Sequence, residues 1–274
     1  MTLQNLLCLY PQFDTACLKG LYLKHLLHTI GSAYRPFVYA NFLSSIDGRI
    51  ALDDIAMSES YTPRQMKSAS DFSLFMELHA QADCLITHGG YLRALNSGRL
   101  GNILQVHQPD LIEWRLSQGL TAQPAIVIAS ASLDFPMHES LHLSGQTVYI
   151  ATGTKADPTR VNYWKSRGYS ILTAGDGRMV TGEPLVSQLG ALGFQSLYLI
   201  AGPQMLDAMI RDRQLSRLYL TLSHQLIGGE NFHSLIAGSH FESEASLILQ
   251  SLYYEKNPLP KSSQFFLQFS LNQN

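Results

Sequence analysis

The stretch Leu197–Gln204, which reads LYLIAGPQ, decides the fold class. Its four leading apolar residues predict a buried strand, and Gly202 permits a tight turn with close backbone approach. Pro203 suits the first position of a helix, where its missing N–H would have no partner in any case. The apolar residues that follow share one helical face: Met205, Leu206, Met209 and Ile210. A second apolar strand, 218–222, completes a strand–turn–helix–strand unit.

The first turn of that helix carries N–H groups without intrahelical partners, which makes it a candidate anion site. A nucleotide pyrophosphate is the ligand that we expect there. The alternative is an ordinary crossover in which Gly202 only forms a turn and no ligand binds, because one glycine is weak evidence.

Composition narrows the class of protein. The chain has 274 residues, 46% of them hydrophobic, and a formal net charge of -2, so we expect a large core and no nucleic-acid partner. No apolar run reaches the length of a membrane span, and residues 1–5 lack the basic region of a signal peptide. Three cysteines without metal spacing (Cys8, Cys17 and Cys84) predict reduced thiols, a cytoplasmic location and no metal site.

The N-terminal segment, residues 1–34, is expected to be a helical extension to a main domain of residues 35–274. Thr15 is a candidate cap for a helix that runs to about Ile30, with leucines along one side. This stripe must cover either the main domain or a second subunit, and the sequence leaves both open.

The main domain begins with an expected strand at 37–43, followed by a turn around Asp47. Asp47 either caps this turn with its carboxylate or positions a substrate. Thr62-Pro63 predicts the start of a helix that runs to Ala80 and carries His79 on its apolar face. His79 is either a core histidine or a catalytic one.

Later strands alternate with helices. The expected strands are 82–87, 124–129, 147–151 and 169–172. The expected helices lie near 111–116 and at 183–192, and a further one starts at 157–159. The first of these strands leads into His88-Gly89-Gly90, a second glycine turn. Strands at 246–254 and 265–271, joined by a proline-rich turn at 257–260, predict a terminal antiparallel hairpin. The pattern is that of an α/β domain with a mostly parallel sheet, closed by antiparallel strands.

From about Arg35 to Leu271 the chain resembles the reductase domain of the riboflavin-biosynthesis deaminase/reductase proteins. The matching pieces occur in the family's order: SIDGRIA at 45–51, AQADCLI at 80–86, QPAIVI at 123–128, AGP at 201–203 and LIGG at 226–229. The resemblance implies a three-layer, dihydrofolate-reductase-like fold, a homodimer, and NADPH-dependent reduction of the ribosyl side chain of a pyrimidine.

The sequence departs from the family where substrate binds. The family's Thr and Ala-Asp-Asp-Pro are replaced by residues 91–97, its Glu before the glycine turn by Ile200, and its Arg late in the long helix by His79. Its Trp-Ile-Thr corresponds to Ser60-Tyr61-Thr62. These changes predict an altered substrate site.

By the resemblance, the cofactor residues are Leu43 at the nicotinamide, Ser130 at the adenosine end, and two turns at the phosphates and ribose. These turns comprise Thr87, Gly89 and Gly90, and Gly202, Pro203, Gln204, Met205 and Leu206. Asp47, His79 and Tyr61 are the catalytic candidates, because a proton must accompany the hydride. The rival interpretations are a non-catalytic nucleotide-binding homologue and a reductase of a different small heterocycle.

Overall fold

The computed structural model describes residues 4–54, 59–241, 245–257 and 263–271. Residue contacts divide the chain into two compact units. Unit 1 comprises residues 1–25, 39–77 and 215–274, and unit 2 comprises residues 26–38 and 78–214.

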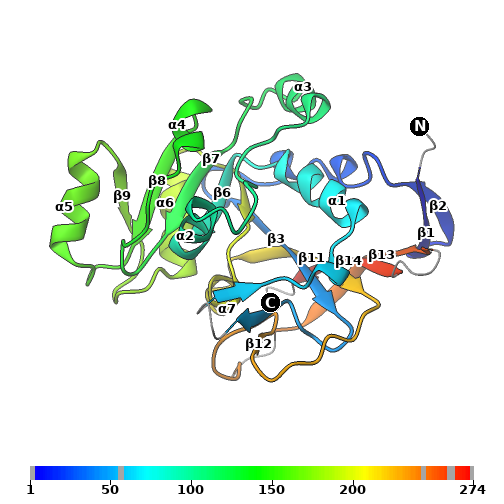
Figure 1. Ribbon diagram of the computed structural model, residues 1–274. Coiled ribbons are helices and arrows are strands. Elements are labelled where there is room, and N and C mark those ends of the chain that lie inside the picture. The colour runs from blue at the N-terminus through cyan, green and yellow to red at the C-terminus, as the bar shows by residue number, and fades with distance from the viewer. Residues whose placement is uncertain (1–3, 55–58, 242–244, 258–262, 272–274) are drawn as a thin grey trace. The chain divides into compact units, whose positions relative to one another are not determined.

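Unit 2 is built on a parallel sheet with the strand order β10-β6-β7-β8-β9 (Figure 1). The strands are β6 (Cys84–His88), β7 (Ala125–Ala129), β8 (Val148–Thr152), β9 (Ser170–Thr173) and β10 (Ser196–Leu199). Every residue of β7 and β10 is buried, as expected for continuous apolar strands in a parallel sheet. The helices of this unit are α2 (Gly89–Asn96), α3 (Pro109–Ser117), α4 (Glu139–Leu143), α5 (Pro158–Ser166), α6 (Gly182–Ala191) and α7 (Pro203–Arg211).

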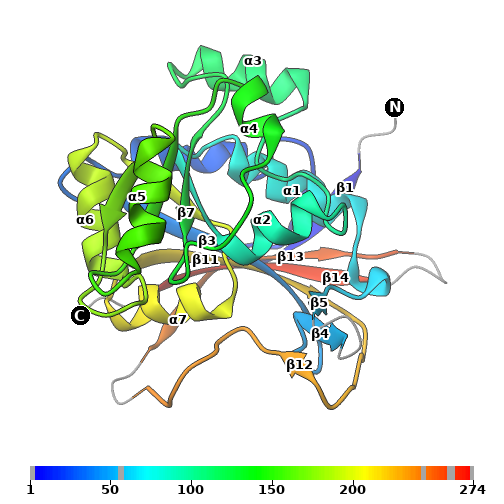
Figure 2. The same ribbon diagram turned by 60° about the vertical axis from the view of Figure 1, so that its left-hand side comes forward.

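Unit 1 contains a sheet with the strand order β2-β1-β13-β14-β11-β3, of which β11, β13 and β14 are seen side by side in Figure 2. Its strands are β1 (Asn5–Tyr10), β2 (Asp14–Cys17), β3 (Phe37–Ser45, of which 39–45 lie in this unit), β11 (Leu215–Ser223), β13 (Leu247–Glu255) and β14 (Gln264–Leu271). The pairs β1–β2, β1–β13, β13–β14 and β11–β14 are antiparallel. A small second sheet joins β12 (Phe232–His233), β4 (Ala51–Asp54) and β5 (Glu59–Tyr61).

The expected N-terminal helix from Thr15 to Ile30 is wrong. That region contains the end of β2 and two 3-10 turns, η1 (Leu23–His25) and η2 (Leu27–Thr29), and β1 precedes it. Gly20 has φ +80° and Leu26 has φ 48°, values that interrupt a right-handed helix. Pairing of β1 with β13 outweighs the helical spacing of the leucines. The division of the chain at residue 34 stays a prediction.

The long helix α1 (Ala69–His79) ends close to the expected residue but begins later than Thr62-Pro63 predicts. Pro63 instead precedes a 3-10 turn, η3 (Arg64–Met66), after which Lys67 is extended. The helix is capped by Ser68, whose Oγ accepts the N–H of Asp71 at 3.0 Å.

The α/β class and the terminal hairpin are confirmed, since β13 and β14 pair along their length. The antiparallel part is larger than expected because β1 and β2 extend it. Most of the proline-rich turn expected at 257–260 lies outside the described residues. Among the described helices, none combines the length and the hydropathy that a membrane crossing requires.

Candidate functional site

Most of the expected cofactor residues lie at one edge of the unit 2 sheet. Thr87 is the second-last residue of β6, Ser130 follows β7, and Gly202 follows β10. These three strands are adjacent and parallel, so their carboxyl ends meet at the same edge, where ligands of open α/β sheets bind. Gly89 and Ser130 are in close contact, because a Cβ added at Gly89 would lie 3.1 Å from Ser130 Oγ.

Two helices begin at this edge of the sheet. Neither α2, after β6, nor α7, after β10, receives a hydrogen bond from the side chain of its N-cap residue, His88 or Gly202. By contrast, Asp157 caps α5, and Asp212 Oδ2 accepts the first N–H groups of α6 at 2.6 and 3.0 Å. Unneutralised helix N-termini attract anions such as phosphate.

The turn before α7 is open. A Cβ added at Gly202 would have no atom within 4 Å, and Pro203 occupies the first helical turn as expected. Gln204 is exposed and Met205 is half-buried. Leu206 is fully buried, so only its backbone can face a ligand.

Two threonine hydroxyls at this edge are buried without a hydrogen-bond partner among the described residues: Thr87 Oγ1 and Thr152 Oγ1. The register aligns Thr87 with Ile128 and Ile150, and Thr152 lies two residues after Ile150, so both hydroxyls are on one face of the sheet. Buried polar groups are normally paired, and an orphaned one calls for an explanation such as a ligand. Thr152 was missing from the sequence-based site, although a hydroxyl after a strand was the signal for it.

His88 and Arg93 are further residues of this edge that sequence reasoning missed. Burial, followed by the nearby Arg93 guanidinium, lowers the pKa of His88 to about 4, so the imidazole is neutral at physiological pH. Arg93 Nη1 donates to the backbone oxygen of Asp134 at 2.6 Å, which ties α2 to the loop after β7.

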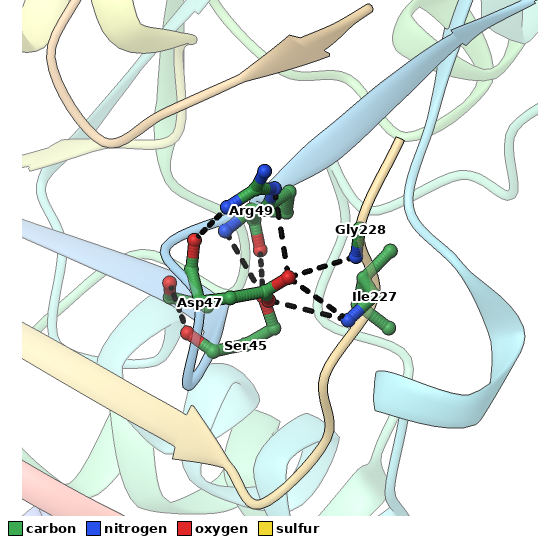
Figure 3. A network of polar contacts seen from close by, with 6 residues as sticks. Ser45, Asp47, Arg49, Ile227 and Gly228 are labelled. Carbon is green, nitrogen blue, oxygen red and sulfur yellow. Dashed lines mark hydrogen bonds and ion pairs between the residues drawn. The ribbon is translucent and has the colours of Figure 1, made fainter. Parts of the chain in front are cut away.

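Asp47 lies in unit 1, where it holds two loops together (Figure 3). Its carboxylate accepts the Ser45 hydroxyl at 2.5 Å and the N–H groups of Ile227 and Gly228 at 3.1 and 2.7 Å. Arg49 Nε lies 3.6 Å from Oδ2, and the Arg49 guanidinium also donates to the backbone oxygen of Asp47.

These contacts decide what Asp47 can do. The Ser45 hydroxyl, the Gly228 and Ile227 N–H groups and Arg49 together lower the pKa of Asp47 to about 2. A carboxylate that stays ionised is a poor proton donor at neutral pH. The geometry therefore favours the turn-capping interpretation of Asp47 over a direct part in proton transfer.

His79 lies in unit 2 and is fully buried. Its ring meets the Tyr198 ring edge to face at 6.3 Å, and burial together with Arg115 lowers its pKa to about 3. Arg115 is itself buried and donates to the backbone oxygens of Ala80 and Ala82. Burial and a neutral ring are what the core interpretation of His79 requires.

Tyr61 and Leu43 belong to unit 1. Tyr61 is 48% exposed on β5 and lies eight residues before α1, and its catalytic role stays a prediction. Leu43 lies on β3, and its contact with a nicotinamide stays a prediction.

Ser60, Asp53 and His233 form an exposed polar cluster on the small sheet. Both Ser60 Oγ and Asp53 Oδ1 contact the same ring nitrogen, His233 Nε2, at 2.9 and 2.8 Å. A nucleophilic triad needs the serine and the carboxylate on opposite ring nitrogens, so this cluster is not arranged for hydrolysis.

Comparison with known proteins identifies relatives of this chain. A model of the RibD C-terminal domain matches residues 36–256. Among curated proteins, the 2,5-diamino-6-ribosylamino-4(3H)-pyrimidinone 5′-phosphate reductase of Aquifex aeolicus is 24% identical over 215 residues, which cover 78% of this chain and 88% of that protein.

Solved structures share the fold. A pyrimidine reductase-like protein from Corynebacterium diphtheriae has a TM-score of 0.65 at 16% identity, covering 87% of this chain and 93% of its own. RibD from Acinetobacter baumannii has a TM-score of 0.59 at 16% identity, with 87% and 58% covered. The riboflavin biosynthesis reductase of Saccharomyces cerevisiae has a TM-score of 0.57 at 12% identity, with 92% and 99% covered.

Proposed function

The chain belongs to the RibD C-terminal domain family, and from this premise we propose that it is an NADPH-dependent reductase with an altered substrate site. The observation that carries the proposal is the open edge of the unit 2 sheet. There, two helix N-termini without side-chain caps and two orphaned threonine hydroxyls meet at the carboxyl ends of adjacent parallel strands.

The residues at this edge fit a dinucleotide. The N–H groups at the start of α7 would hold the pyrophosphate, close to Gly202, while Gly89 and Gly90 would allow phosphate or ribose to approach α2. Thr87 would donate its hydroxyl to the cofactor, and Ser130 would lie near the adenosine. The nicotinamide supplies the hydride, and the protein supplies orientation.

The substrate is proposed to be a small heterocycle that differs from the pathway pyrimidines. Ile200 stands where the family has a carboxylate. Its backbone N–H donates a hydrogen bond to the backbone oxygen of Ile86 in the sheet. His79, in place of an arginine, is buried and neutral. A site that has lost such polar groups discriminates against the substrate they once held.

A non-catalytic nucleotide-binding homologue is the second candidate. Two observations favour it. Asp47 is kept ionised by the groups that hydrogen-bond to it, and His79 is fully buried in the core. Neither group is suited to donate the proton that hydride transfer needs.

We also propose a homodimer, formed through the unit 1 sheet. On β11, β13 and β14 the rows Leu220–Leu267–Leu252 and Leu222–Phe265–Tyr254 place apolar side chains on one face. All six are only half-buried, and Leu7 of β1 extends the patch as an exposed residue. A broad apolar face of this kind suits burial against a second copy.

One assay distinguishes the two candidate functions. Purified protein is mixed with NADPH and a panel of small heterocycles, including 5-amino-6-(5-phosphoribosylamino)uracil and its diamino-pyrimidinone counterpart, and absorbance at the nicotinamide band is followed. A reductase consumes NADPH with at least one heterocycle. NADPH binding without consumption across the panel supports the non-catalytic candidate, and no NADPH binding refutes both.

A further inference from the structure

The small sheet of unit 1 brings together three polar side chains from three different strands. The strands β12, β4 and β5 pair in that order and lie side by side in Figure 2. Asp53 is directly opposite Ser60 in the register of β4 and β5, and His233 of β12 is opposite Ala51. Opposed residues, and residues two apart on one strand, share a face of a sheet. Asp53, Ser60 and His233 therefore project from the same face.

The polar atoms of these side chains form a nearly equilateral triangle. Ser60 Oγ lies 2.7 Å from Asp53 Oδ1 and 2.9 Å from His233 Nε2. Asp53 Oδ1 lies 2.8 Å from the same Nε2. The side chains of His233 and Asp53 are 38% and 37% exposed, and Ser60 is exposed as well. A small ion from solution can therefore approach all three.

Hydrogen bonding alone satisfies this triangle poorly. The Ser60 hydroxyl donates its proton to Asp53, and a neutral imidazole offers at most one proton at Nε2. That N–H cannot point at Ser60 Oγ and Asp53 Oδ1 at once, because the two oxygens lie in different directions from it. In the other tautomer, Nε2 presents a lone pair to a carboxylate. A cation bound to both atoms removes that repulsion.

The spacing of the three atoms matches one face of an octahedral metal site. With metal–ligand bonds of about 2.0–2.1 Å at right angles, neighbouring ligand atoms lie about 2.8–3.0 Å apart. A tetrahedral ion with bonds of the same length needs about 3.3 Å between its ligands. The distances of 2.7, 2.8 and 2.9 Å therefore fit an octahedral ion. An imidazole nitrogen favours a transition metal such as Ni²⁺ over Mg²⁺ or Ca²⁺, which prefer oxygen ligands.

We propose that Asp53, Ser60 and His233 form a binding site for an octahedral divalent transition-metal ion, with water at the remaining positions. The site goes beyond the proposed reductase function, because the cofactor edge belongs to unit 2 and these three residues belong to unit 1. The expectation of no metal site was based on the spacing of the cysteines, and none of the three ligands is a cysteine.

The ligands differ in strength. Asp53 and His233 are the principal ligands, and the neutral hydroxyl of Ser60 is the weakest of the three. The described part of the chain has no cluster of three His, Cys, Asp or Glu side chains that could hold a metal. With a hydroxyl as its third ligand, this site is one of moderate affinity, and the ion can exchange with solution.

The test is a calorimetric titration of the full chain with NiCl₂, after removal of any affinity tag and treatment with a chelator. We expect one Ni²⁺ ion per chain, with a dissociation constant in the micromolar range. Asp53→Asn removes the charge of one ligand, and His233→Phe keeps the ring but removes its nitrogens. Each should weaken binding by about tenfold or more. Ser60→Ala should weaken it less, by a few-fold.

A second exposed histidine provides the matched control. His142 of α4 also contacts a hydroxyl through Nε2, that of Tyr169 at 3.0 Å. His142→Phe should bind Ni²⁺ as the wild type does. Co²⁺ then reports the geometry, because a six-coordinate Co²⁺ ion absorbs visible light weakly and a tetrahedral one absorbs it intensely. We expect the weak spectrum for the wild type and its loss in His233→Phe.

Circular dichroism verifies that each variant folds, and Ser60→Ala decides the matter if the other two do not. The proposal is overturned if the wild type binds no Ni²⁺, or if folded Asp53→Asn, His233→Phe or Ser60→Ala binds it with unchanged affinity. An equal loss of affinity in His142→Phe, or an intense Co²⁺ spectrum, also overturns it.

Discussion

Replacing Gly202 with valine tests the assignment of the nucleotide site. A Cβ at this position meets no atom within 4 Å, and the backbone, at φ -75° and ψ -174°, is accessible to any L-residue. Valine is a poorer N-cap residue than glycine, which costs about 1 kcal/mol of stability. The variant should therefore fold, with its added side chain projecting into the space that a pyrophosphate would use.

The expected loss of affinity follows from the hydrogen bonds at the start of α7. If two N–H groups no longer reach the pyrophosphate, about 3 kcal/mol or more is lost, since bonds to charged acceptors are worth roughly 1.5–3 kcal/mol each. Binding that is micromolar in the wild type, on the order of 8 kcal/mol, then weakens by about a hundredfold or more.

The assay is a fluorescence titration with NADPH, together with circular dichroism to verify folding. Gly101→Val is the matched control, because its Cβ also meets no atom within 4 Å but the residue lies outside the strand-end turns. An unchanged NADPH affinity in folded Gly202→Val would refute the assignment of this turn to the pyrophosphate.

Three further results are expected. Light scattering at tens of micromolar should give twice the 30.5 kDa chain mass, and a monomer would contradict the dimer through the apolar face. Asp47 has its pKa lowered from 3.8 to about 2, so its stabilisation is present above about pH 4 and lost toward pH 2. Urea midpoints of wild type and Asp47→Asn should therefore differ at pH 7 and converge below pH 4, and a constant difference would show that ionisation of Asp47 is irrelevant. Ile200→Glu should not restore turnover of the pathway pyrimidine, because a lone half-buried carboxylate lacks its charged partner; recovery of activity would show that Ile200 alone altered the site.

The strands β7 and β10 of unit 2 could be predicted from the sequence because each is a nearly continuous apolar run with a turn residue soon after it. Gly202-Pro203 predicts the start of α7 correctly, because the preference of proline for the first helical position depends only on local backbone geometry. The same reasoning failed at Thr62-Pro63. There the proline precedes a short 3-10 turn that ends at Lys67, and the α-helix begins only after Ser68.

The N-terminal segment could not be predicted because its structure depends on distant partners. Its leucines have helical spacing, but β1 forms only by pairing with β13, and Gly20 is held by Glu77.

The central claim is that this chain binds NADPH but no longer accepts the pathway pyrimidine well. The most direct test is the steady-state kcat/KM of the purified wild-type protein with 5-amino-6-(5-phosphoribosylamino)uracil at saturating NADPH. The account predicts measurable NADPH binding with a kcat/KM well below about 10⁴ M⁻¹s⁻¹, the lower end of ordinary enzyme efficiency. A value above that limit would contradict it and show that the protein is an ordinary reductase of the riboflavin pathway.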